Sequence, residues 1–160
     1  MHAVDARRSH ATFTVSHLYV GHVSGSVPIV NAGVTLAPDS AIPTEIVATL
    51  DPKHIDTHDT DRDVDLQGSD WFDTAKFPTW QFRSNKIAPS SPGAFTSDGT
   101  LTVHGVTSPL TLKVTIVRGL PHPLYHAVAH VDRHAFGMQR TTFDPLIGND
   151  VEIVLDIELS

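Results

Sequence analysis

Apolar and polar residues alternate with a period of two along most of this chain. In residues 9–18, for example, Ala11, Phe13 and Val15 fall on one face, while the threonines between them fall on the other. This period is typical of a half-buried β-strand. The same alternation predicts further strands over residues 19–36, 41–50, 79–87, 99–104, 110–117, 124–133 and 151–159.

The eight predicted strands follow one another with turns between them and with no internal repeat. At 160 residues the chain fits a single domain, residues 1–160. Closing an antiparallel sheet into a barrel removes the exposed edges that an open sheet would present. We therefore predict an all-β fold, an eight-stranded antiparallel up-and-down barrel.

Turn-forming residues indicate where strands bend or end. Pro28 and the run Asn31-Ala32-Gly33 predict a kink or bulge inside the second strand. Residues 88–97 are rich in proline, serine and glycine, which predicts a surface loop between the fourth and fifth strands.

One segment between the third and fourth strands departs from the alternation. Thr60 is a predicted helix N-cap, and aspartates in the first turn would be stabilised by the helix dipole. Apolar or small residues then recur at helical spacing, namely Val64, Gly68, Trp71, Phe72 and Ala75. Gly68 costs about 1 kcal/mol inside a helix, so two short helices meeting there fit equally well. We predict a short helical insertion that closes or shapes one end of the barrel.

The composition excludes several classes of function. The formal net charge is -7 with no cluster of Lys or Arg, which argues against a nucleic-acid partner. The absence of cysteine excludes disulfides, thiolate metal sites and thiol catalysis. No apolar run approaches the roughly 20 residues of a membrane span. The first residues lack the apolar core of a signal peptide, so we expect a cytoplasmic protein, or a periplasmic or secreted one if a signal was removed.

Histidine is unusually frequent, with 11 residues, and four of them stand four apart at His122, His126, His130 and His134. On a helix they would be neighbours able to bind zinc or nickel. On a strand, four residues span about 13 Å, too far for two histidines to share a metal. The alternation from Tyr125 favours the strand. We therefore predict no metal site, with a histidine-dependent metal enzyme or sensor as the alternative.

Motifs for phosphate binding or hydrolysis are missing, so we predict no catalysis.

Five separated motifs occur in one order along the chain. They are Ser9-His10 with Phe13-x-Val15-x-His17-Leu18, then Val23-x-Gly25-x-Val27, then Ile55-Asp56-Thr57 with Arg62-Asp63, Leu66, Asp70-Trp71-Phe72-Asp73 and Phe77-Pro78, then Gly99 to Thr107, and last Asp132-Arg133 with Phe136-Gly137-Met138, Ile147-Gly148 and Val151. In these motifs the chain resembles the YceI-like family, lipocalin-like proteins that carry polyisoprenoids.

The resemblance implies a single YceI-like, lipocalin-like barrel whose apolar interior holds one long isoprenoid chain, such as a polyprenyl lipid or the tail of a quinone. An eight-stranded barrel can hold one slender ligand. That lipid is then the expected partner, no other cofactor is expected, and dimerisation is left open. The alternatives are a solid core and a ligand-free, stress-related interaction module.

The predicted ligand-binding residues combine the apolar strand faces with the aromatic pair of the helical insertion. They are Phe13, Val15, His17, Val23, Trp71, Phe72, Phe82, Leu101, Val103, Leu112, Val114, Phe136 and Met138. Trp71 and Phe72 are predicted to gate one end of the barrel. Arg62 and Arg133, each beside an aspartate, are candidates for holding a polar headgroup, and the alternative is an Arg-Asp pair that fixes a loop.

Overall fold

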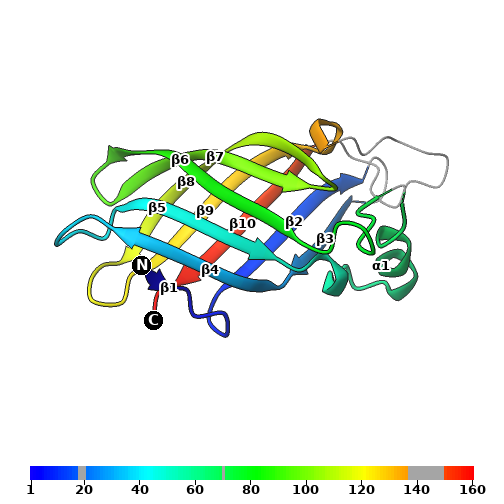
Figure 1. Cartoon of the computed structure of the whole chain (residues 1–160), viewed down its shortest axis with the longest axis horizontal. Helices are drawn as coiled ribbons and strands as arrows, with labels where there is room; N and C mark the ends of the chain where they lie inside the picture. The colour runs from blue at the N-terminus through cyan, green and yellow to red at the C-terminus, as the bar shows by residue number, and fades with distance from the viewer. Residues whose placement is uncertain (18–20, 70, 137–149) are drawn as a thin grey trace.

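A computed structural model describes residues 1–17, 21–69, 71–136 and 150–160, with side chains except at residues 16, 17, 21, 22, 133 and 134. One antiparallel sheet curls into a barrel, with the short helix α1 at one end (Figure 1). The strands are β1 (His2–Ala3), β2 (His10–His17), β3 (Gly21–Val27), β4 (Ile29–Leu36), β5 (Pro43–Leu50), β6 (Trp80–Ser91), β7 (Ala94–Val103), β8 (Val106–Arg118), β9 (Leu124–Asp132) and β10 (Asp150–Glu158). The helical elements are the 3-10 turns η1 (Pro52–His54) and η2 (Arg133–Phe136), and α1 (Thr60–Leu66).

The strand order around the sheet is β1-β4-β5-β6-β7-β8-β9-β10-β2-β3. Most neighbours in this order are also consecutive in sequence, as in an up-and-down barrel. The exceptions are β1, which pairs with β4, and β10, which pairs with β2. The β10–β2 register places Val151 opposite Val15 and Leu155 opposite Ala11. The predicted all-β antiparallel barrel is therefore confirmed.

The number of strands differs from the prediction, with ten in the described residues instead of eight. One addition is the short β1, which pairs with β4. The other arises because the predicted strand 19–36 is divided at Pro28 into β3 and β4. Proline lacks the backbone N–H that a continuous ladder needs. The helical insertion keeps its place between residues 50 and 80, which is now the connection from β5 to β6.

The predicted surface loop over residues 88–97 is wrong. β6 continues to Ser91 and β7 begins at Ala94, so most of that segment is a hairpin. Pro89 is tolerated because the pairing shifts by one residue next to it, between Pro89 and Ser91. The turn itself needs Gly93, whose φ of 74° is in the left-handed region that favours glycine.

The two chain ends are hydrogen-bonded to the sheet and to each other. The Val4 N–H donates to the Ala32 carbonyl of β4 at 3.1 Å, and the Asp5 N–H donates to the Glu158 carbonyl of β10 at 2.8 Å. The N–H of Ser160 in turn donates to the Ala3 carbonyl at 3.1 Å. Figure 1 accordingly places the two termini side by side. The edges of the sheet are β1 and β3, and this N-terminal segment links β4, next to one edge, to β10, two strands from the other.

The helical insertion is shorter than predicted. Its N-cap is Asp59, not Thr60, and the Asp59 carboxylate accepts from the Arg62 N–H at 3.1 Å. The helix ends at Leu66, which is fully buried, whereas Val64 on the predicted apolar face is 65% exposed. Trp71 and Phe72 follow in turns and are both buried. Neither a single long helix nor a second short one forms in the described part of this segment, and no described helix is long and apolar enough to cross a bilayer.

Candidate functional site

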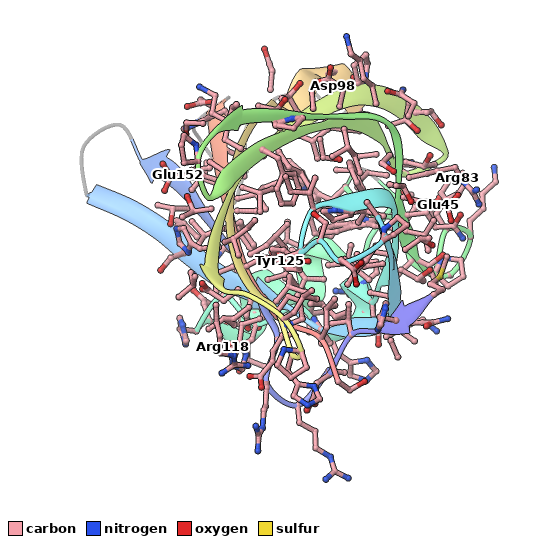
Figure 2. The ribbon with its side chains drawn as sticks, turned by 90° about the vertical axis from the view of Figure 1, so that its left-hand side faces the viewer. Glu45, Arg83, Asp98, Arg118, Tyr125 and Glu152 are labelled. Atoms are coloured by element: carbon pink, nitrogen blue, oxygen red, sulfur yellow. The ribbon has the colours of Figure 1, made fainter. Side chains whose placement is uncertain are left out.

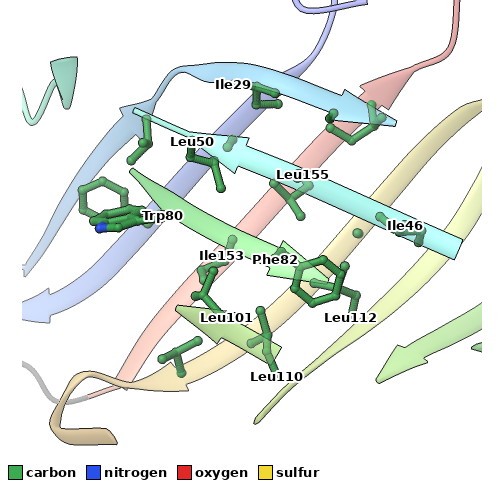
Figure 3. A pocket seen from close by; sticks show the side chains of 18 of the residues that line it. Ile29, Ile46, Leu50, Trp80, Phe82, Leu101, Leu110, Leu112, Ile153 and Leu155 are labelled. Carbon is green, nitrogen blue, oxygen red and sulfur yellow. The ribbon is translucent and has the colours of Figure 1, made fainter. Parts of the chain in front are cut away.

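The barrel encloses an apolar cavity of about 190 Å³ (Figure 3). This volume is the space open to the centre of a water-sized sphere. One water needs roughly 10–15 Å³ of such space, so the cavity has room for on the order of a dozen. The described lining residues include no charged side chain. Water would find almost no hydrogen-bond partners on these walls, so the cavity favours an apolar ligand.

Strand alternation builds the walls of the cavity. On β7, Phe95, Leu101 and Val103 point inward and are buried, while Asp98 points outward. The inward-facing Ile153 and Leu155 of β10 line the cavity but are only half-buried. In a filled core, side chains at such positions would be covered by the opposite wall. Their remaining exposure shows that the barrel is hollow, which argues against the alternative of a solid core.

Tyr125 crosses the bore at the end of the barrel remote from α1. Its hydroxyl donates to the carbonyl of Ala41 at 2.6 Å, in the hairpin between β4 and β5. Four steps in the strand order separate β9 from β5, so this bond joins β9 to a hairpin that belongs to the opposite side of the barrel. Burial raises the pKa of Tyr125 to about 12, so the hydroxyl keeps its proton and donates at neutral pH.

An aromatic pair lies at the α1 end of the cavity. The rings of Phe72 and Trp80 meet edge to face, with centroids 4.8 Å apart and an interplanar angle of 82°. Both residues line the cavity, together with Ile55. Trp71 is as buried as Phe72, at 4% exposure each, but it does not line the cavity. Of the two predicted gate residues, Phe72 therefore lies in the cavity wall and Trp71 is buried elsewhere.

The structure brings most of the predicted ligand-binding residues together around the cavity. Val23 and Trp71 are buried but do not line it, the His17 side chain is not described, and Met138 lies outside the described residues. Nine of the thirteen line the cavity: Phe13, Val15, Phe72, Phe82, Leu101, Val103, Leu112, Val114 and Phe136. Contact with a ligand stays a prediction for all thirteen.

Several lining residues were absent from the predicted set. The alternation had placed some of them on inward faces, but nothing distinguished a wall of a cavity from ordinary core. They include Ile46, Leu50, Trp80, Tyr125, Ile153, Leu155 and Ile157.

Arg62 lies outside the cavity and holds the segment before α1. Its Nε donates to the hydroxyl of Thr57 at 2.9 Å, and its Nη2 donates to the Thr57 carbonyl at 2.7 Å. Asp63 accepts from the Thr57 N–H at 3.0 Å, and Thr57 is buried. These bonds fit the role of fixing a loop, through Thr57 in place of a direct pair with Asp63. A headgroup role stays a prediction for Arg62 and for Arg133, whose side chain is not described.

The middle of the histidine-rich segment forms the strand β9, as the alternation predicted, whereas His122 precedes this strand and His134 lies in η2. His126 and His130 lie on β9 and sit beside carboxylates of β10. His126 Nδ1 is 2.8 Å from an oxygen of Asp156, and His130 Nε2 is 3.7 Å from one of Glu152. Within the part of the chain that the structure describes, no group of three His, Asp or Glu residues is placed to hold a metal.

Comparisons with known proteins agree with this architecture. A UPF0312 protein of Vibrio vulnificus is 27% identical over 118 residues, which make up 72% of this chain and 62% of that protein. A UPF0312 protein of Shewanella denitrificans is 28% identical over the same shares. The chain thus spans 62% of the length of these relatives.

Two solved structures share the fold over nearly the whole chain. BcnA of Burkholderia cenocepacia superposes with a TM-score of 0.87 at 23% identity, covering 98% of this chain and 99% of that one. A polyisoprenoid binding domain from Saccharophagus degradans, implicated in plant cell wall breakdown, gives a TM-score of 0.76 at 13% identity, covering 99% and 97%. A model of the YceI-like domain matches residues 2–159. This protein therefore belongs to the YceI-like domain family.

Proposed function

We propose that this protein binds one long-chain isoprenoid lipid, a polyprenyl lipid or an isoprenoid quinone, inside its barrel and stores or carries it without altering it. The observation that carries the proposal is the cavity, which is enclosed by apolar side chains from most of the strands. The described lining contains no Asp, Glu, Lys, Arg or His. The Saccharophagus degradans domain that shares the fold is described as polyisoprenoid binding, which supports the ligand class.

Burial of the chain accounts for the expected affinity. Each CH₂ group moved from water into the cavity contributes about 0.8 kcal/mol. Association costs about 4–15 kcal/mol in lost translational and rotational freedom, so a short apolar molecule would bind weakly. A chain of several isoprene units exceeds this cost without polar contacts. An apolar cavity therefore selects long chains over short ones.

Native mass spectrometry of the purified protein, followed by titration of the lipid-free protein with geranylgeraniol, tests the proposal. We expect either a co-purified lipid or saturable binding of one molecule per chain. A folded, lipid-free protein that binds neither geranylgeraniol nor a menaquinone would refute it.

Two adjacent residues of β5 provide a matched pair of variants. Ala48 lines the cavity, whereas Thr49 does not. Ala48→Trp is expected to fill the space and abolish binding, at a cost of about 1–3 kcal/mol in stability. Thr49→Trp adds the same side chain outside the cavity and is expected to bind as the unmodified protein does. Equal binding by both variants would place the ligand elsewhere.

A further inference from the structure

We propose that Tyr125 sets the length of isoprenoid chain that this protein holds, by forming a floor against which the far end of the chain stops. This inference rests on the proposed function. It assigns the orientation of the ligand as well: the apolar end of the chain lies against Tyr125, and the other end lies toward Phe72 and Trp80.

The floor is formed by Tyr125 together with the hairpin between β4 and β5. Tyr125 projects from β9, and its hydroxyl reaches the Ala41 carbonyl next to β5 on the opposite wall. Figure 2, which looks along the barrel from this end, places Tyr125 within the ring of strands and not on its rim. A chain entering from the α1 end therefore meets the Tyr125 ring across its path.

Neighbouring contacts hold the ring in this position. Phe95 is 1% exposed and packs edge to face against the Tyr125 ring. The two ring centroids are 5.8 Å apart and the interplanar angle is 85°. Tyr125 is itself only 5% exposed. A side chain fixed at its hydroxyl and along its ring gives way less readily than an aliphatic one, since rotation would break a buried hydrogen bond.

The next inward-facing residue of β9 leaves space above this floor. Ala127 is 4% exposed and lines the cavity, so its small side chain keeps the bore open directly beside Tyr125. Val131 lines the cavity farther along the same strand. The six residue-to-residue steps from Tyr125 to Val131 span about 20 Å of strand. With a strand tilt of about 40°, the bore is about 15 Å deep along the barrel axis.

This depth predicts how affinity changes with chain length. Each added isoprene unit increases the buried apolar surface until the bore is full, and further units remain in water. Affinity should therefore rise by about tenfold or more per unit and then level off. Moving the floor should move the chain length at which affinity levels off.

Dissociation constants for geraniol, farnesol, geranylgeraniol and a longer polyprenyl alcohol test the inference in four proteins. Tyr125→Ala lowers the floor, and the plateau should move to a chain longer by one unit. Ala127→Leu raises the floor, and the plateau should move to a shorter chain. Tyr125→Phe keeps the ring but loses the bond to Ala41, and it should leave the plateau where it is in the unmodified protein.

The outcomes separate this inference from the function on which it rests. A plateau at the same chain length in all four proteins would refute the role of Tyr125 while leaving isoprenoid binding intact. If no alcohol binds the unmodified protein, the proposed function fails. If Tyr125→Ala does not fold, Ala127→Leu can still refute the inference, because an unchanged plateau would show that the chain does not end beside Tyr125.

Discussion

Replacing Phe72 by alanine separates gating of the cavity from support of the barrel, because its neighbour Trp71 provides a matched control. Both side chains are 4% exposed, yet only Phe72 lines the cavity. Truncating a buried Phe or Trp to alanine costs about 3–5 kcal/mol of stability. For Phe72 this includes the edge-to-face pair with Trp80, which is worth about 0.5–1.5 kcal/mol. We expect similar losses of stability in the two variants.

The two variants should differ in ligand affinity. Loss of the Phe72 ring removes contact with the ligand equivalent to one or two buried CH₂ groups, about 0.8 kcal/mol each. The dissociation constant should then rise about four- to fifteenfold. Trp71→Ala removes no side chain from the cavity wall, so its dissociation constant should change less than that.

Urea unfolding followed by circular dichroism gives the stability of each variant, and titration with geranylgeraniol gives the affinity. Affinities are compared at a temperature where both variants are fully folded. If the two variants weaken binding to the same extent, the effect comes from a general loosening of the barrel. Phe72 would then be an ordinary core residue and not part of the gate.

Three further substitutions test how the barrel is held together. Leu66→Ala should lower the free energy of unfolding by about 2–5 kcal/mol in urea, because this side chain of α1 is fully buried. Gly99→Ala should cost about 1–3 kcal/mol in the same assay, since a Cβ there would overlap the Arg83 carbonyl oxygen, which belongs to the paired strand β6. Glu158 accepts a hydrogen bond from Arg118 at 3.0 Å, which holds the pKa of its carboxyl below the usual value. The ionised carboxyl therefore stabilises the folded state above the ordinary glutamate pKa of about 4.3, and this stabilisation is lost as pH falls through the lowered pKa. Glu158→Gln should thus be less stable than the unmodified protein at neutral pH, and the difference in stability should shrink in acid. A constant margin from neutral to acid pH would contradict this.

The inward and outward faces of the strands could be predicted from the sequence, because successive side chains of a β-strand point to opposite faces of the sheet. Phe82 with its outward neighbour Arg83, and Leu112 with Lys113, point as the period of two predicted. The same period does not fix where a strand ends. Pro89 lies in a run that is typical of a loop, yet a shift in pairing allows β6 to continue past it.

The helical insertion shows how tertiary contacts override local propensity. Asp59 and Thr60 are both good N-caps, and only the folded chain selects Asp59. Helical spacing placed Val64 on the buried face, whereas Leu66 is the residue that enters the core. With only seven residues, α1 depends on this packing more than on its own helix propensity.

The cavity could be predicted only through the resemblance to the family. A run such as Val151 to Ile157 alternates in the same way whether the opposite wall touches it or leaves a space. The hydrogen bond from Tyr125 to Ala41 joins residues 84 positions apart, and no local pattern indicates it. Contacts of this kind depend on the closed barrel and appear only in three dimensions.

The cavity needs the pairing of β10 with β2, a contact between strands near the two ends of the sequence. Strand pairs such as β6 with β7 are local hairpins and can form early. Val151 and Val15, by contrast, are paired although most of the chain lies between them in sequence. Contacts between residues so distant in sequence form slowly, because a long loop must close first. Until that happens the apolar walls belong to an open sheet and enclose nothing. If the proposed function holds, the protein should bind an isoprenoid lipid only after β10 has paired with β2 and completed the walls of the cavity.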